Sequence, residues 1–243
     1  MSSLKKDLNN MRLDKFLCTC GLGTRSEVIR LIKDSIVYVN DVLVKDKEYK
    51  VNELTDIVKV NDEVIIYEKY HYVMLHKPKG YVTSTKDIDP TVMELVTEFS
   101  KYGVVPVGRL DKDTEGLLLF TNDGALAHNL TTPKKHVEKT YFVELLNPIS
   151  DIYIKDFSEG IVIDDGYKTL PSKLSIIDDH HVYLTIMEGK FHQVKRMMEA
   201  INNKVVYLKR VSFGPLILDD NLTVGTCRKL TKEEVELLIK HTK

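Results

Sequence analysis

One segment of the chain concentrates ionisable side chains between two glycines. Residues 108–116 read Gly-Arg-Leu-Asp-Lys-Asp-Thr-Glu-Gly, and an apolar run over residues 117–120 follows at once. These charges fit three interpretations: a solvated surface loop, a carboxylate pair that cleaves a glycosidic bond as acid and base, or a single aspartate kept ionised by a cation as a nucleophile. A charged loop that leads into a buried strand favours a reactive carboxylate at the rim of a cleft.

The cysteine and histidine residues point to no metal site. Cys18 and Cys20 lack a second pair at metal-binding spacing, and His180 and His181 follow two aspartates in a predicted turn. Three cysteines are also too few, and odd in number, for a disulfide framework. We therefore expect no metal and a reducing, cytoplasmic compartment.

Composition indicates a globular protein of one large domain or two smaller ones. The chain has 243 residues, 43% of them apolar, and 35 basic against 36 acidic side chains give a formal charge of −1. No apolar run is long enough to cross a membrane, and residues 1–10 are polar, without the apolar segment of a secretory signal. Overall neutrality does not exclude nucleic acid, because local charge decides that interaction.

Residues 11–70 have the pattern of a small independent module. Leu13, Phe16 and Leu17 have the spacing of a short amphipathic helix, and a capping box from Thr24 to Glu27 predicts the start of a second. Short strands are predicted from residue 36 to residue 66. The module carries a net charge of +3 over residues 12–33, from Arg12, Lys15, Arg25, Arg30 and Lys33 against two acids.

That charge alone is also consistent with a solvated helical face. The order of the residues, however, resembles the small RNA-binding module named after a ribosomal small-subunit protein. In that family the two helices carry a basic face that docks on structured RNA. The resemblance implies that Arg12, Lys15, Arg25, Arg30 and Lys33 contact RNA.

Residues 71–243 are predicted to form a larger α+β domain after a polar, aromatic bridge at residues 67–72. Strands are predicted at 73–76, 117–121 and 140–145, with further strands at 161–163, 174–177, 182–187 and 205–208. Helices are predicted at 91–99, at 192–201, and from a second capping box at Thr231 to about Lys240. Strands and long helices do not alternate regularly, which disfavours a doubly wound parallel sheet.

Five segments of this domain resemble, in order, the motifs of the pseudouridine synthases of the RsuA branch. The most specific is Gly-Arg-Leu-Asp-x-x-Thr-x-Gly-Leu-Leu-Leu-Phe-Thr-Asn-Asp-Gly over residues 108–124. The other four span residues 74–84, 138–141, 188–197 and 208–216. The resemblance implies an RNA-binding module joined to a catalytic domain with a mixed, mostly antiparallel sheet and a central cleft.

The resemblance assigns catalytic roles to Asp111, Tyr141 and Lys195. Asp111 matches the aspartate that attacks the ribose carbon of uridine, or assists a glycal-type intermediate, when the glycosidic bond breaks. Tyr141 matches the tyrosine that stacks on the displaced base, and its hydroxyl can take part in proton removal from carbon five. The reaction neither changes redox state nor transfers a group to water, so no cofactor is expected.

Lys195 matches a basic residue of the family that is usually arginine, and a cation near Asp111 would lower its pKa and orient it. Lysine lacks the two-pronged geometry of arginine, so Arg196 remains an alternative partner. Leu208 matches a position that packs under the nucleotide. The substrate-binding residues implied by the resemblance are Arg109, Leu110, Lys190, His192, Arg196 and Leu208.

The segment Lys-Phe-His-Gln-Val-Lys at 190–195 is closer to the small-subunit enzymes of the branch, since large-subunit relatives tend to have arginine in place of His192. Ser84, Thr85, Asp87, Pro90, Thr91 and Val92 favour the same assignment. We therefore predict a monomer that isomerises one uridine of 16S rRNA within an assembling small subunit. The alternatives are a 23S rRNA uridine, a non-catalytic RNA-binding assembly protein, and a carboxylate-pair glycosidase, which the absence of tryptophan sugar platforms disfavours.

Overall fold

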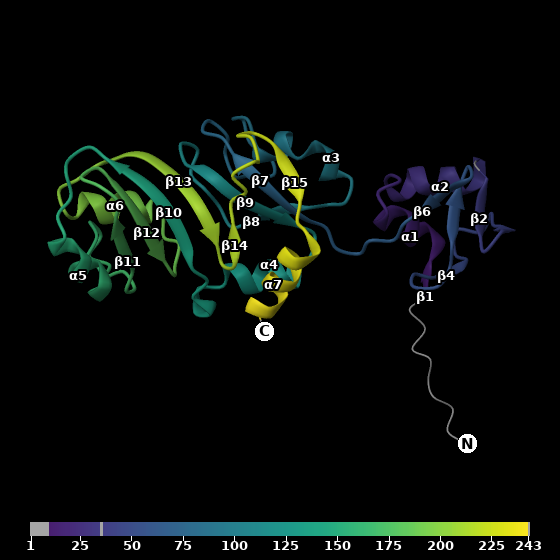
Figure 1. Ribbon diagram of the computed structural model, residues 1–243. Helices are drawn as coiled ribbons and strands as arrows, with labels where there is room; N and C mark the ends of the chain where they lie inside the picture. The colour runs from purple at the N-terminus through teal and green to yellow at the C-terminus, as the bar shows by residue number, and fades with distance from the viewer. Residues whose placement is uncertain (1–9, 35, 243) are drawn as a thin grey trace, which may run out of the picture. The chain divides into compact units, whose positions relative to one another are not determined.

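The computed structural model describes residues 10–34 and 36–242 (Figure 1). The polar N-terminal segment interpreted above as lacking a secretory signal lies outside these ranges, apart from Asn10. The described chain divides into two compact units. The first runs to His71 and includes Glu98–Gly103, and the second comprises Tyr72–Thr97 and the described residues from Val104 onward. No helix within the described ranges is long and apolar enough to span a bilayer.

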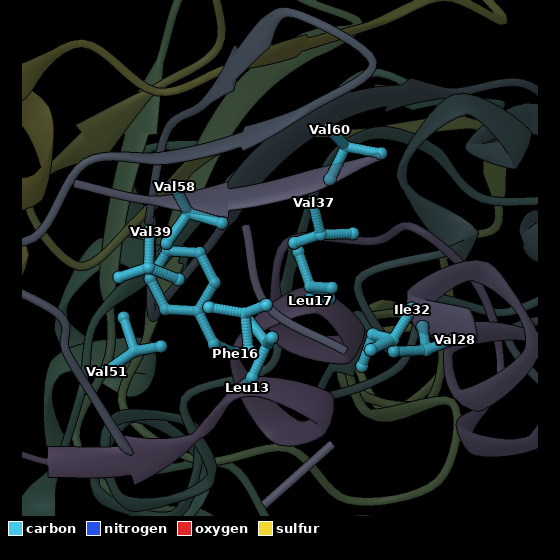
Figure 2. Packing of buried hydrophobic residues seen from close by; sticks show 11 residues of the cluster. Leu13, Phe16, Leu17, Val28, Ile32, Val37, Val39, Val51, Val58 and Val60 are labelled. Atoms are coloured by element: carbon cyan, nitrogen blue, oxygen red, sulfur yellow. The ribbon is translucent and has the colours of Figure 1, made fainter. Parts of the chain in front are cut away.

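Residues 10–71 of the first unit contain, in their described part, two helices packed on small antiparallel sheets. Their elements are β1 (Asn10–Arg12), α1 (Leu13–Thr19), α2 (Arg25–Asp34), β2 (Val37–Val39), β3 (Val42–Leu43), β4 (Lys50–Asn52), β5 (Val58–Val60) and β6 (Glu63–Ile65). The predicted stripe of Leu13, Phe16 and Leu17 is fully buried against Val37 and Val58 (Figure 2). The capping box is confirmed, because Thr24 N–H donates to Glu27 Oε2 at 2.7 Å and Glu27 N–H to Thr24 Oγ1 at 3.4 Å.

The second unit is built on a large sheet with the strand order β11-β12-β10-β13-β9-β7-β15, to which β8 and β14 add at β9 and β13. The strands are β7 (Tyr72–Lys77), β8 (Val105–Val107), β9 (Glu115–Thr121), β10 (Lys139–Leu145), β11 (Lys173–Ile176), β12 (His181–Ile186), β13 (Val205–Phe213), β14 (Leu216–Ile217) and β15 (Cys227–Lys229). Within the described residues, β9 and β13 form its parallel strand pair and the other named pairs are antiparallel. The predicted mixed, mostly antiparallel sheet is therefore confirmed.

Helices cover the sheet where its strands bury apolar side chains. Their bounds are α4 (Gly124–Thr131), α5 (Ile152–Glu159), α6 (Gln193–Glu199) and α7 (Lys232–Thr242), and η2 (Pro133–Lys135) is a short 3-10 turn. α4 and α7 lie beside each other near β8 and β14, while α5 and α6 accompany the half of the sheet formed by β10–β12 (Figure 1). The second capping box is confirmed at the start of α7, where Thr231 and Glu234 exchange hydrogen bonds.

Two local predictions were wrong. The helix predicted over residues 91–99 is split into a 3-10 turn, η1 (Val92–Leu95), and a single helical turn, α3 (Thr97–Ser100). Val92, Val96 and Thr97 are β-branched and stiff in a helix, which disfavours one continuous element. The strand predicted at 161–163 is reduced to an isolated bridge between Val162 and Lys168.

Candidate active site

The loop of residues 108–114 connects β8 to β9 and is held from beneath by a buried lysine. Lys77, at the end of β7, has no exposed surface, and its ammonium donates to the carbonyl oxygens of Pro78 at 3.0 Å, Asp111 at 3.0 Å and Thr114 at 2.8 Å. Burial lowers the pKa of Lys77 to about 8, although Asp113 and Asp111 oppose that shift. The ammonium therefore replaces the water that these loop carbonyls would otherwise bind.

Two further contacts fix the same loop. The Thr83 hydroxyl donates to the Leu110 carbonyl at 2.7 Å and accepts from the Leu110 N–H at 3.1 Å. Gly116 has φ +113°, and a Cβ at this position would lie 2.2 Å from the carbonyl oxygen of Arg210 on the parallel strand β13. Glycine is required here because the two backbones approach so closely. The loop thus leaves the sheet along a defined path.

A cavity of about 290 Å³ opens beside the loop. Strands β10, β12 and β13 supply apolar wall residues, Tyr141, Ile186 and Leu208, which are nine-tenths or more buried. The remaining lining residues come from the loop and from the segment that begins α6: Arg109, Leu110, Asp111, Thr114, Gly189, Lys190, Phe191, His192, Gln193, Val194 and Lys195. The volume is at the small end of the range for ligand pockets, which suits one nucleoside better than a longer strand.

Asp111 lies at the polar end of this cavity, with its side chain about one third exposed. Its Oδ2 is 3.6 Å from Lys195 Nζ and 3.7 Å from His192 Nε2. Lys195 also forms a shorter pair with Asp113, at 2.6 Å and 2.9 Å to its two carboxylate oxygens. Burial opposes ionisation of Asp113, but the Lys195 hydrogen bonds hold its pKa below the ordinary value. The lysine therefore lies between two carboxylates, and one of them faces the cavity.

Arg196, the alternative cation left open by the sequence, is directed elsewhere. Its guanidinium pairs with Asp164 and, at 2.7 Å, with Asp165, and it is not among the residues that line the cavity. Of the two basic residues, Lys195 is the one that the structure places beside Asp111. Arg196 instead joins α6 to the loop that follows α5.

The segment that carries Lys195 is braced by a buried carboxylate. Glu188 is 6% exposed and accepts hydrogen bonds from Gln193 Nε2 at 2.8 Å, the Leu170 N–H at 3.0 Å and the Tyr167 hydroxyl at 2.8 Å. Gln193 in turn accepts from the Lys190 N–H at 2.8 Å. His192 adopts a left-handed backbone, φ 50°, at the N-cap of α6. This bracing holds both His192 and Lys195 toward the cavity.

The structure therefore brings together eight of the nine catalytic and substrate-binding residues predicted in this unit: Arg109, Leu110, Asp111, Tyr141, Lys190, His192, Lys195 and Leu208. Sequence reasoning did not single out Phe191, although its ring is 75% exposed and stacks on His192 with 3.8 Å between centroids. The sequence feature that could have identified Phe191 is its position as an aromatic residue between the basic residues Lys190 and His192. Among the described residues, no group of three or more histidine, cysteine, aspartate or glutamate side chains is arranged to hold a metal ion.

The basic residues predicted on the first unit separate into two kinds. Lys15, Arg25, Arg30 and Lys33 are exposed on α1 and α2, and of these Arg25 also lies 3.6 Å from the buried carboxylate of Asp14. Arg12 is engaged internally, with bonds of 3.0 Å and 2.8 Å to the buried carboxylate of Asp14 and 3.0 Å to Glu48. These bonds hold the pKa of Asp14 below its ordinary value despite its burial. Arg12 therefore supports α1 as well as adding to the local charge.

Similarity to known proteins agrees with this arrangement. Residues 71–200 match the RNA pseudouridylate synthase family, and residues 11–64 match the S4 domain. The chain belongs to this family and, within it, to the RsuA branch of pseudouridine synthases. It is therefore an isomerase, which favours an enzyme over the non-catalytic protein and the glycosidase considered from the sequence.

Individual relatives match nearly end to end. An RNA pseudouridine synthase of Bacillus subtilis is 47% identical over 94% of this chain and 98% of its own length. The ribosomal small subunit pseudouridine synthase A of Haemophilus influenzae is 42% identical over 95% and 100%, and that of Vibrio cholerae 44% over 93% and 98%. A crystal structure of a pseudouridylate synthase covers 94% of this chain and 99% of its own, with 41% identity and a TM-score of 0.67.

Proposed function

We propose that this pseudouridine synthase isomerises one uridine of 16S rRNA in an assembling small subunit. The observation that carries the proposal is the small cavity in which Asp111, Tyr141 and Lys195 meet. The relatives from Haemophilus influenzae and Vibrio cholerae are named for the small subunit and align over nearly the whole chain. A histidine at position 192 supports the same target.

Asp111 is proposed as the group that acts on the ribose. The bond between C1′ and N1 breaks with its electron pair going to N1, and the ionised carboxylate either bonds to C1′ or assists formation of a glycal. In the first route the freed uracil turns and C5 bonds to C1′ as the bond between C1′ and the carboxylate oxygen breaks. In the second, the carboxylate takes the C2′ proton to form the glycal and returns it to C2′ as C5 bonds to C1′. In both routes the C5 proton then leaves and N1 ends protonated. Atoms and charge balance without a co-reactant. Both routes use the ionised carboxylate, and the Lys195 ammonium, 3.6 Å from Oδ2, is the cation placed to orient it.

The apolar wall is proposed to hold the uracil while it is detached. Tyr141 and Leu208 lie on neighbouring strands, β10 and β13, and both line the cavity. A ring stacked on Tyr141 can turn in its own plane without losing contact area, whereas a hydrogen-bonded base would have to break its bonds. The Tyr141 hydroxyl is the proposed group nearest the departing C5 proton.

The proposed division of labour assigns RNA docking to residues 11–70 and catalysis to residues 71–243. Exposed Lys15, Arg25, Arg30 and Lys33 would bind phosphates, and Arg12 would add charge. The target must leave its stack to reach Asp111, at a cost of a few kcal/mol. We also propose that the enzyme acts as a monomer, since Asp111, Tyr141 and Lys195 all come from one chain, and that it acts in the cytoplasm.

Mapping pseudouridine in total rRNA from cells with and without the protein tests the target. We expect one 16S rRNA position to lose its pseudouridine and to regain it when the gene is restored. Loss at a 23S rRNA position instead would establish the alternative target. Unchanged modification of both rRNAs would contradict the proposal.

A further inference from the structure

A second cavity, of about 280 Å³, adjoins the one that holds Asp111. Arg109, Tyr141 and Gly189 line both, so the two cavities share a wall. The second is bounded by Lys139 of β10 and Arg210 of β13. The chemistry proposed at Asp111 uses neither Lys139 nor Arg210.

The two cations lack carboxylate partners. Lys139 Nζ donates to the Val137 carbonyl at 2.8 Å, and Arg210 Nε donates to the Leu117 carbonyl at 2.8 Å. Arg210 is 2% exposed, and its Nη2 has no hydrogen-bond partner in the described part of the chain. Neither forms an ion pair within the described residues. Burial, reinforced by Arg210, lowers the pKa of Lys139 to about 8. Both cations lie over the Phe213 ring, at 5.6 Å and 5.0 Å from its centroid, and Glu188 opposes the pKa shift of Lys139. Two desolvated cations without an ion pair remain costly, which favours the binding of an anion.

The acidic residue in the lining does not supply that anion. Glu188 borders the cavity, but its two oxygens already accept from Tyr167, Leu170 and Gln193. Arg109 adds a third cation, which is exposed and makes no ion pair or hydrogen bond within the described ranges through its side chain. Three basic side chains against one engaged carboxylate leave the cavity strongly positive.

We propose that this second cavity binds a backbone phosphate that directly flanks the target uridine, with Lys139 and Arg109 as contacts and Arg210 as a buried source of positive potential. The inference rests on the proposed function. A nucleotide with its C1′ at Asp111 has its flanking phosphates one sugar away, and the neighbouring cavity, which shares Arg109 and Tyr141 with the first, is the basic space adjoining that position. Fixing that phosphate would set the position of the ribose relative to the carboxylate.

The test replaces single phosphates in the rRNA fragment that the enzyme converts, whichever subunit it comes from. Each phosphodiester near the target is exchanged for an uncharged methylphosphonate, and kcat/KM is measured for wild type, Lys139→Gln and Lys139→Arg. At one flanking position we expect the wild-type value to fall about 10- to 100-fold. Lys139→Gln should be insensitive there, while Lys139→Arg should keep the sensitivity.

Lys155→Gln, which removes an exposed charge from α5, is the matched control and should respond to methylphosphonates as wild type does. Circular dichroism checks that Lys139→Gln is folded; if it is not, Arg109→Gln, which changes the exposed contact of the same cavity, takes its place in the series. Insensitivity of wild type at both flanking positions overturns the proposal. So does Lys139-dependent inhibition by inorganic phosphate without any methylphosphonate effect, since the cavity would then take a free anion. Failure of wild type to modify 16S rRNA would instead refute the proposed target.

Discussion

The loop of residues 108–114 and the helical face of the first unit both carry charge, but they hold it in different ways. In the loop, the backbone is bound by a lysine without exposed surface, and Lys195 lies between two carboxylates. On α1 and α2, Lys15, Arg25, Arg30 and Lys33 extend into solvent. Chemistry at one carbon atom needs a fixed charge, whereas docking on a phosphate backbone needs net charge and reach. The predictions below test that contrast.

The largest effect on stability is expected from Lys77→Met. The substitution keeps an unbranched chain but removes the donor to the carbonyl oxygens of Pro78 and of the loop residues Asp111, Lys112 and Thr114. Leaving them unsatisfied should lower the free energy of unfolding by at least about 3 kcal/mol. Urea unfolding followed by tyrosine fluorescence measures the change. Lys112→Met, which removes an exposed charge paired with Asp89, is the control, and equal midpoints for both variants would contradict the account.

The same lysine predicts a pH dependence. Its pKa is about 8 in the folded protein, against an ordinary value of 10.5. Between these values the unfolded chain binds more protons than the folded one, so stability rises with pH across this window. The full gain is about 3 kcal/mol. Wild type should therefore gain stability relative to Lys77→Met from pH 8 to 10.5, and parallel curves would exclude a shifted Lys77.

Phe191→Ala tests a residue that lies at the cavity but is exposed like the docking residues. We expect its exposed ring to stack on a nucleobase of the bound RNA, so KM should rise about tenfold while kcat changes little. Steady-state kinetics on the rRNA fragment measures both. Phe191→Tyr keeps the stacking surface and should behave as wild type. A fall in kcat at unchanged KM would place the ring in the chemical step instead.

Arg25→Ala combined with Arg30→Ala should have the smallest effect on chemistry. If Arg25 and Arg30 bind phosphates as proposed, their removal should reduce the slope of log affinity against log salt by up to about 2, with kcat at saturating RNA preserved. Filter binding at several salt concentrations gives the slope. A double control, Lys155→Ala with Lys240→Ala, removes the same charge from α5 and α7. An equal reduction of the slope in the two double variants would mean that α1 and α2 contribute no more to RNA binding than the control helices.

Sequence patterns predicted what depends on local order. The two capping boxes and the buried stripe of α1 follow from patterns of neighbouring residues. The meeting of Asp111 with Tyr141 and Lys195 was implied only by the resemblance to the pseudouridine synthase family. The sequence indicates the burial of Lys77 only weakly, because the sole sign of it is a lysine at the end of an apolar strand. Nothing in the sequence indicates that Asp164 and Asp165 pair with Arg196, because only the folded chain brings them close to α6.

The second cavity shows more clearly which features of the fold the sequence does not predict. Lys139 and Arg210 lie on neighbouring strands, where Tyr141 is opposite Arg210 after a shift in register. A single irregularity in that pairing decides which side chains share a space. Residue types and spacing along the chain carry no information about such a shift, so neither residue could be connected to Arg109 from sequence.

The most direct test of the central claim is release of tritium from rRNA labelled at carbon five of uridine. Wild type should release label at the target, and Asp111→Asn should lose at least about 1000-fold of that activity, as expected on removal of a nucleophile, while retaining RNA affinity. Asp113→Asn and Glu115→Gln, which neutralise nearby carboxylates, should remain active. Near-normal release by Asp111→Asn, or equal loss in a folded control variant, would contradict the assignment of Asp111 as the single catalytic carboxylate.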